Sequence, residues 1–261
     1  MPALMAMVSA FSLVGRYVGA RLDVDLSTCG VGDVAIVESP RRLRREQSYS
    51  FIHALWWFWL ADGRSVASVP PSVGEAIGEV LRGACSAEQL ADTTLVTRLR
   101  SPVDVALLAA GLPATDRAQR ALWFACDAVH LRQHPCESCR RITDESMLPA
   151  EGLRLPGHCF PDGIVYGVVA DGRVASVAYA HRSGLMEDQV ADLGVETAPE
   201  YRRRGYARAA VAAVVEHITR TGGEAVYHCA PDNLPSIATA HSVGFVPYGS
   251  SLALHAPAGA L

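Results

Sequence analysis

The sequence predicts a mixed α/β (α+β) fold in which helices flank a mostly antiparallel central sheet. The stretch from Asp192 to Phe245 reads as strand, basic loop, helix, strand, loop and short helix, an order that lays one helix between two neighbouring strands. Strand-forming runs flank both Asp62-Gly63 and Asp171-Gly172, and an Asp-Gly turn between two such runs predicts an antiparallel hairpin. Hydrophobic residues make up 50% of the chain, which is enough for a substantial core.

Composition narrows the classes of function. The chain has 261 residues, enough for one large domain or two modest ones, and its formal net charge is −4. Proteins that bind the phosphates of nucleic acid usually have a basic surface, so this charge argues against a nucleic-acid partner. The seven cysteines are an odd number scattered along the chain, a pattern typical of reduced thiols in a cytoplasmic protein.

The N-terminal fifteen residues are apolar but lack the basic segment of a signal peptide, and the run is too short to span a membrane. We therefore expect a buried first element and no membrane partner. The densest basic run, residues 41–45, is expected to be a solvated loop, with binding of an anionic partner as the alternative.

An N-terminal α+β region, residues 1–115, carries no chemical motif of its own. Phe51 to Leu60 is a bulky apolar run that predicts a strand buried on both faces, and we expect His53 within it to be a hydrogen-bonded core residue. Ser72-x-x-Glu75 and Ser86-x-x-Gln89 have the spacing of capping boxes, so each predicts the start of a short helix.

A helix is also predicted from Thr115 to about Arg132, because apolar residues recur there at helical spacing. We expect this helix to join the N-terminal region to a second domain, residues 116–261.

A cysteine pair follows this predicted helix. Cys136-x-x-Cys139 lies near His134, with His158-Cys159 further on, and such a group could bind zinc. Because a second C-x-x-C is missing, we expect ordinary thiols and no metal. A structural metal and a redox pair remain as alternatives.

The basic loop of the central stretch predicts an anion site. Residues 202–204 are three consecutive arginines, and Gly205 lets the backbone approach a bound group closely. The helix that follows ends at Gly222-Gly223. Free amides at its N-terminus carry partial positive charge, so a phosphate or pyrophosphate is the natural ligand.

Two motifs in this stretch carry a family resemblance. Arg202-x-x-Gly205-x-Ala207 is similar to the (Gln/Arg)-x-x-Gly-x-(Gly/Ala) motif of the GCN5-related N-acetyltransferases (GNAT), and Asn233-x-x-Ser236 with Gly244-Phe245 resembles their second conserved block. The resemblance covers roughly residues 140–249. It implies a first strand at residues 140–144, followed by the hairpin around Asp171-Gly172 as second and third strands.

The resemblance also implies that acetyl-CoA binds where the sheet opens beside the fourth strand, which would here be residues 192–197. Backbone groups of that strand would pair with the pantetheine arm. The residues implied in cofactor binding are Val195, Thr197, Arg202, Arg203, Arg204, Gly205, Tyr206, Ala207, Asn233 and Ser236.

An acceptor amine must lose a proton before it can attack, and for a lysine-like amine this costs roughly 4 to 5 kcal/mol at pH 7. In the family the general base often comes from the fourth strand, which makes Glu196 and Asp192 the candidate catalytic residues, although either could instead pair with an arginine of the loop. Ala240 stands where many members carry a tyrosine that protonates the leaving thiolate; His241 and Tyr248 are weak substitutes.

Four further residues have alternative roles. Tyr166, Tyr179 and His181 lie on the second hairpin and would either line a substrate pocket or pack in the sheet. Cys229 could in principle accept the acetyl group, but we expect a buried, inert thiol.

The function that follows is N-acetyl transfer from acetyl-CoA to a primary amine of an unidentified small molecule or protein, with no metal required. A homodimer is left open. The alternative is a catalytically impaired CoA-binding sensor or partner-binding module, which the missing tyrosine at Ala240 keeps under consideration.

Overall fold

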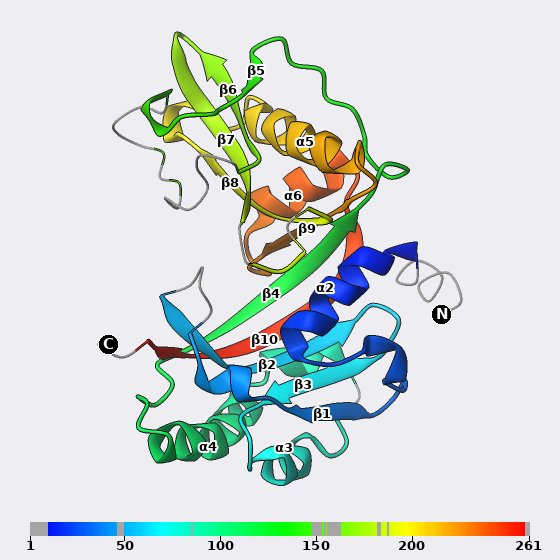
Figure 1. The fold of residues 1–261 in the computed structure, drawn as a ribbon, viewed down its shortest axis with the longest axis vertical. Helices are drawn as coiled ribbons and strands as arrows, with labels where there is room; N and C mark the ends of the chain where they lie inside the picture. Colours follow the sequence, from blue (N-terminus) through cyan, green and yellow to red (C-terminus); the bar gives the residue numbers. More distant parts are fainter. Residues whose placement is uncertain are drawn as a thin grey trace. The chain divides into compact units, whose positions relative to one another are not determined.

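The structure is a computed structural model that describes residues 10–45, 50–84, 86–147, 153, 155, 163–181, 184–186 and 188–258. It is a mixed α+β fold with mostly antiparallel strand pairing, as the sequence predicts (Figure 1). The chain divides into two compact units, Met1–Trp123 with Pro247–Leu261 and Phe124–Val246. The domain boundary expected between residues 115 and 116 stays a prediction.

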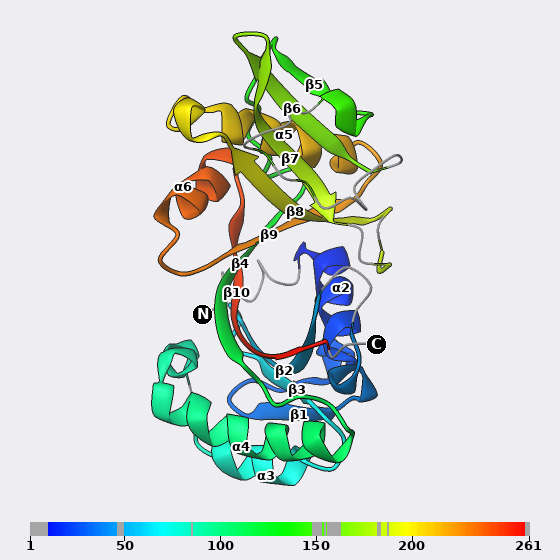
Figure 2. The same cartoon turned by 90° about the vertical axis from the view of Figure 1, so that its left-hand side faces the viewer.

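The first unit is a sheet with helices on both faces. In chain order its elements are α2 (Ser12–Leu22), η1 (Leu26–Thr28), β1 (Val34–Glu38), η2 (Pro40–Leu43), β2 (Phe51–Leu60), β3 (Ser65–Val69), α3 (Gly74–Leu81), η3 (Ala87–Ala91), α4 (Thr93–Ala109), β4 (Arg117–Cys126) and β10 (Val246–Pro257). Its strands follow the order β1-β3-β2-β10-β4. Figure 2 shows α2 on one face of this sheet and α3 and α4 on the other.

The hairpin predicted around Asp62-Gly63 is confirmed. β2 pairs with β3 antiparallel, with Trp56 opposite Ser68, and Gly63 adopts a left-handed φ of +94° in the turn. Because side chains alternate along a strand, Trp57 packs into the core formed with α3 and α4, whereas Trp56 faces α2. There the guanidinium of Arg21 lies 4.7 Å from the Trp56 ring centroid.

The helix predicted from Thr115 to Arg132 is wrong, because this segment forms strand β4. The indole Nε1 of Trp123 donates a hydrogen bond of 2.8 Å to Ser251 Oγ on β10. Val129, which the helical pattern placed on the apolar face, is 87% exposed. Sheet pairing and the aromatic residues of the strand outweigh a local apolar spacing that fits a helix.

The two predicted capping boxes have different outcomes. The reciprocal bonds form between Ser86 and Gln89, but they start the 3₁₀-helix η3 and not an α-helix. Ser72 does not cap α3, which begins at Gly74 without a side-chain cap on its own N-cap residue. Glu38 Oε1 accepts the N–H of Gly74 at 2.8 Å. A carboxylate distant in sequence therefore satisfies this helix start.

The predicted solvated loop at residues 41–45 is wrong for Arg42, which is fully buried. Its Nη2 donates to the carbonyl oxygen of Arg21 at 2.6 Å, and its Nη1 donates to that of His53 at 3.2 Å. Arg44 and Arg45 are exposed, as predicted. His53 is buried, as expected, and stacks on Trp56 with ring centroids 4.7 Å apart.

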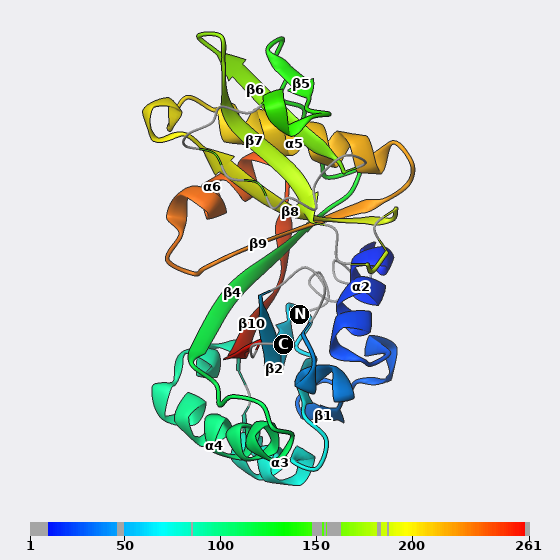
Figure 3. The same ribbon diagram turned by 60° about the vertical axis from the view of Figure 1, so that its left-hand side comes forward.

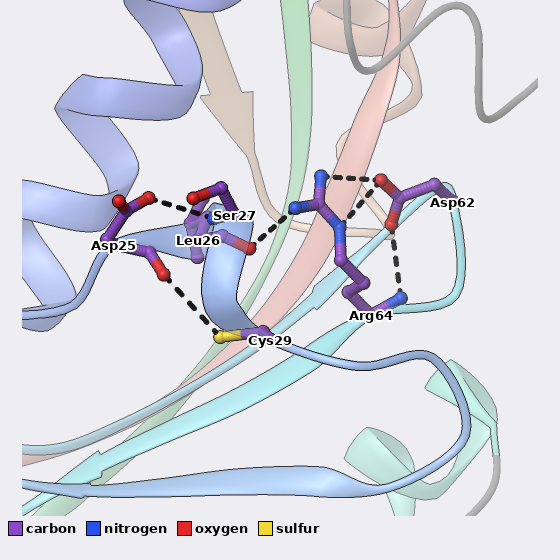
Figure 4. Close-up of polar contacts among 6 residues, drawn as sticks. All are labelled: Asp25, Leu26, Ser27, Cys29, Asp62 and Arg64. Atoms are coloured by element: carbon purple, nitrogen blue, oxygen red, sulfur yellow. Dashed lines mark hydrogen bonds and ion pairs between the residues drawn. The ribbon is translucent and has the colours of Figure 1, made fainter.

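An arginine ties the segment after α2 to the β2–β3 turn (Figure 4). Nε and Nη2 of Arg64 both donate to Asp62 Oδ2, at 2.9 and 2.6 Å, and Nη1 donates to the carbonyl oxygen of Leu26 at 2.6 Å. Cys29 lies beside this cluster, with Sγ 4.0 Å from the carbonyl oxygen of Asp25. The Asp62 side chain is only 5% exposed, so Arg64 supplies the charged donor that a buried carboxylate needs.

We expect Arg64→Ala to lower the free energy of unfolding by about 1 to 3 kcal/mol, because it leaves a buried carboxylate without its charged donor. Denaturant titration of the variant beside Arg98→Ala, which removes an exposed arginine from α4, measures this loss. Equal stability of the two variants would contradict the structural role of Arg64.

The second unit contains β5 (Cys139–Arg141), η4 (Glu145–Met147), β6 (Val165–Ala170), β7 (Arg173–His181), β8 (Val190–Thr197), η6 (Pro199–Tyr201), α5 (Tyr206–Thr219), β9 (Glu224–Cys229) and α6 (Leu234–Val243). Its strand order is β9-β8-β7-β6-β5. Helix α5 packs across β6, β7 and β8 (Figure 3). The hairpin predicted around Asp171-Gly172 is confirmed, with both turn residues in left-handed conformations.

Two expectations fall partly outside the described residues. The predicted buried first element rests mostly on residues 1–9, which are among those not described. For the part of the chain that is described, no helix combines the length and the apolar character needed to cross a membrane.

Candidate functional site

The N-terminus of α5 forms the first part of the candidate site. Gly205 is the N-cap with φ +83°, no side chain caps the helix, and its first turn contains no acidic residue. The first amides of a helix lack intrahelical acceptors and carry the positive end of the helix dipole. Arg203, two residues earlier, also has a left-handed φ of +62°, which is uncommon for a residue with a side chain. This helix start is therefore a site for an anion.

Exposed arginines surround this helix start: Arg202, Arg203, Arg204 and Arg208. Nε of Arg202 donates to the carbonyl oxygen of Thr197 at 3.3 Å, which ties the loop to the end of β8. Arg208 was not among the residues predicted from the sequence. A Cβ at Gly205 would lie 3.1 Å from Arg208 Nε, so this guanidinium stands directly over the glycine. The sequence did contain a signal for Arg208, because a residue three positions after Gly205 lies in the first turn of the predicted helix. Tyr206 and Ala207 begin the helix and are half-buried.

Strand β8 loses its partner on one side halfway along its length. Parallel pairing with β9 ends at Leu193 opposite Tyr227, whereas antiparallel pairing with β7 continues to Thr197 opposite Ser176. Within the described ladders, residues 194–197 therefore pair along one edge only.

Hydrogen bonds show which backbone groups face the unpaired edge. Ala198 N–H donates to the carbonyl oxygen of Ala175 at 3.0 Å, and the carbonyl oxygen of Glu196 accepts from Ser176 Oγ at 3.0 Å. These groups point toward β7. Successive residues of a strand direct their backbone groups to opposite edges, so those of Val195 and Thr197 point away from β7. An extended ligand that carries amides fits this edge.

One face of β8 carries the candidate catalytic carboxylates. Asp192 and Glu196 are four residues apart and therefore point to the same face. Across the ladder, His181 lies opposite Asp192, and Tyr179 lies opposite Gly194. The Tyr179 ring covers this glycine so closely that an added Cβ would lie 2.4 Å from Cζ. Tyr179 and His181 thus share the face of the carboxylates.

Tyr166 lies on the opposite face of the sheet from the carboxylates. Its hydroxyl lies 3.0 Å from Nδ1 of His217 on α5, so it packs against the helix and not on the face of the carboxylates.

A histidine that was not predicted from the sequence completes this face. Nε2 of His228 on β9 lies 3.3 Å from Asp192 Oδ1. The pair depends on the parallel register of β8 and β9, in which Asp192 stands opposite Val226. Alternation from Val226 places His228 on the Asp192 face, a relation that only the register reveals.

The candidate residues in α6 and after it make contacts that stabilise the fold. Oδ1 of Asn233 accepts the N–H of Ser236 at 3.2 Å and thereby caps α6. Ala240 is fully buried, and His241 packs edge-on against Phe124 with ring centroids 5.3 Å apart. Tyr248 lies in the core of the first unit, where it is 1% exposed.

Two cysteines of the second unit, Cys139 and Cys229, have thiols that burial makes harder to ionise. Burial raises the pKa of Cys229, and raises that of Cys139 to about 11, so both resist ionisation at neutral pH. Cys136 and Cys139 line a cavity of about 330 Å³ together with Tyr166 and residues of α5. No three His, Cys, Asp or Glu of the described residues are placed to hold a metal ion, but His158 and Cys159 lie outside those residues.

Comparisons with known proteins give one family match and several similar structures. Residues 129–245 match the family model of the acetyltransferase (GNAT) family. A structure described as a GNAT-family acetyltransferase from Novosphingobium aromaticivorans is 23% identical with a TM-score of 0.47, covering 55% of this chain and 67% of that one. A GCN5-related N-acetyltransferase from Kribbella flavida is 16% identical with a TM-score of 0.44, covering 75% and 81%. A tandem GNAT protein from the clavulanic acid biosynthesis pathway is 19% identical with a TM-score of 0.41, covering 60% and 59%. No curated protein matches the chain.

Proposed function

We propose that the protein is an N-acetyltransferase that moves an acetyl group from acetyl-CoA to a primary amine, because residues 129–245 match the model of the GNAT acetyltransferase family. One observation carries the proposal. The unpaired edge at Val195 and Thr197 leads directly, through the arginine loop, to the uncapped N-terminus of α5. A strand edge for amides followed by an anion site matches the order of pantetheine and pyrophosphate along CoA.

The residues of this chain would hold the cofactor in two ways. The first-turn amides after Gly205 and the surrounding guanidinium groups would bind the pyrophosphate, while the backbone of Val195 and Thr197 would pair with the pantetheine. A backbone N–H near the thioester carbonyl would stabilise the developing oxyanion. Acetyl-CoA supplies an activated acyl group whose thiolate is a fair leaving group near neutral pH.

The carboxylate-bearing face of β8 would receive the acceptor amine. Of the two candidate carboxylates, Glu196 would provide general-base assistance directly, and the buried Asp192 would do so through a neighbouring group. Ala240 leaves no tyrosine to protonate the thiolate. A thiol with an ordinary pKa of about 8.5 leaves without such help, so this substitution is compatible with catalysis.

The proposal also covers the class of acceptor, the cellular location of the protein and its oligomeric state. The polar face suits a primary amine and does not distinguish small amines, amino acids, antibiotics and protein N-termini. The scattered thiols and the net charge of −4 support a cytoplasmic protein that acts on neither nucleic acid nor membrane, and a homodimer stays open. We propose that no metal takes part.

A screen for CoA release tests the function. Metal-free protein with acetyl-CoA and a panel of primary amines should release CoA steadily with at least one amine, because the site needs no Lewis acid. Thiol detection measures the product, and mass spectrometry of the amine identifies the acetyl adduct. Tight binding of acetyl-CoA without turnover on any amine would favour the sensor alternative.

A further inference from the structure

The two side chains of the Asp192–His228 pair differ in their exposure to solvent. The Asp192 side chain is 1% exposed, so an incoming amine cannot contact it directly, whereas the His228 side chain is 28% exposed. The imidazole therefore separates the buried carboxylate from the solvent side of this face.

His228 also stands at the point where the two strands part. It directly follows Tyr227, the last residue of β9 in the described ladder with β8. Its side chain shares the face of Asp192, next to the segment of β8 whose other edge is unpaired. A thioester bound along Val195 would lie close to this histidine.

The contact with Asp192 has the geometry of an ion pair and not of a hydrogen bond, and its orientation is compatible with one tautomer of His228. A carboxylate oxygen that faces Nε2 favours the proton on Nε2, and Nδ1 is then the basic nitrogen. The Nε2–Oδ1 distance of 3.3 Å is longer than a typical hydrogen bond, as is common for catalytic contacts before substrate binds. A carboxylate that orients an imidazole and stabilises its protonated form is a known arrangement for general-base catalysis.

From this geometry, and on the basis of the proposed function, we infer that His228 is the catalytic residue that accepts the proton of the acceptor amine, and that Asp192 is its positioning residue. As the amine nitrogen attacks the thioester carbonyl, the C–N bond forms and the nitrogen proton passes to Nδ1 of His228. The C–S bond then breaks with its electron pair on sulfur, and the thiolate takes up the proton that His228 releases, directly or through water, which returns the imidazole to its neutral form. An amine that arrives as an ammonium ion releases one further proton to solvent.

Other ionisable groups share this face and define the competing assignments. Glu196 lies beyond Gly194 on β8 and His181 lies opposite Asp192 on β7. By register, the neighbours on the same face are Tyr179 and His181 of β7, Asp192 and Glu196 of β8, and Glu224 of β9. Glu196 and His181 are the two groups that a test must separate from His228.

The test uses the full chain with acetyl-CoA and the amine that turns over fastest in the panel. We expect His228→Asn to lower kcat by about 10²- to 10⁴-fold with acetyl-CoA affinity within about twofold of the parent, because general-base catalysis is worth this much. The acidic limb of the pH–rate profile should disappear, and added imidazole should restore part of the rate of His228→Ala. Asp192→Asn should shift that limb, a change that a purely structural role would not cause.

His217→Asn, which alters a histidine on α5 against Tyr166, is the matched control and should keep normal turnover. Loss of the acidic limb in Glu196→Gln or His181→Asn, with the limb retained in His228→Asn, would overturn the inference and leave the proposed function intact. A parent protein that binds acetyl-CoA and acetylates no amine would overturn both.

Discussion

Gly244→Ala should cost about 3 kcal/mol or more of unfolding free energy, the largest single-residue effect on stability that we expect. Gly244 ends α6 with a left-handed φ of +106°, and a Cβ there would lie 2.0 Å from the carbonyl oxygen of His130. The opposing segment cannot retreat easily. Arg132 N–H donates to the carbonyl oxygen of Val243 at 2.8 Å, and His134 Nε2 lies 2.8 Å from that of Ser242. Denaturant or thermal unfolding measures the loss.

Gly222→Ala is the matched control for this variant. Gly222 has a left-handed φ of +80° but nothing within 4 Å of its Cβ position. The control should therefore lose only about 1 kcal/mol of unfolding free energy, the cost of placing alanine in a left-handed backbone conformation. Equal losses in the two variants would show that the approach of residues 130–134 to α6 contributes nothing.

The elements that the sequence predicts correctly are those whose signals are local. The two Asp-Gly hairpins form as predicted because left-handed turn residues between strand-forming runs leave few alternatives. The Gly205 helix start was readable because its glycine and arginines are contiguous. Gly244-Phe245 was recognisable only through a family resemblance, and the structure adds the physical reason that no side chain fits at the glycine.

The errors arise where distant contacts decide. Residues 117–126 carry an apolar pattern compatible with a helix, and pairing with β10 makes them a strand. Arg42 lies in a run of charges typical of a solvated loop. Its guanidinium is nevertheless buried, because it donates hydrogen bonds to backbone carbonyl oxygens of two other segments. The 17-residue helix α4 was not predicted from the sequence, and its interior contains Pro102, a residue that usually breaks a helix. The residues that decide these structures are distant in the sequence, so a local sequence pattern does not reveal them.

The candidate site shows the same division. Val195, Thr197 and the arginine loop follow from the motif, because each is placed by its distance along the chain. His228 could not be selected in that way. Its relation to Asp192 depends on the register of two parallel strands separated by α5, and one residue of slip would turn the histidine to the opposite face.

Gly205→Asp should reduce acetyl-CoA affinity by at least about 100-fold, because a negative charge would occupy the proposed phosphate site at the helix start and the arginines. The new side chain would also meet Arg208, whose Nε lies 3.1 Å from the position that the new Cβ would take. An aspartate there would pair with that guanidinium and cap the first-turn amides, and so take both from the cofactor. Calorimetry with acetyl-CoA measures the change.

Gly222→Asp is the control, because it adds the same charge at a left-handed glycine beyond the opposite end of α5. It should bind acetyl-CoA like the parent chain. Adenosine lacks the pyrophosphate, so any binding of adenosine should be equal in both variants. Since the effect of the charge at residue 205 on the cofactor is electrostatic, raising the salt concentration should narrow the difference between the variants. Unchanged acetyl-CoA affinity in a folded Gly205→Asp protein would remove the loop from the cofactor site and leave the unpaired edge of β8 without its neighbouring anion site.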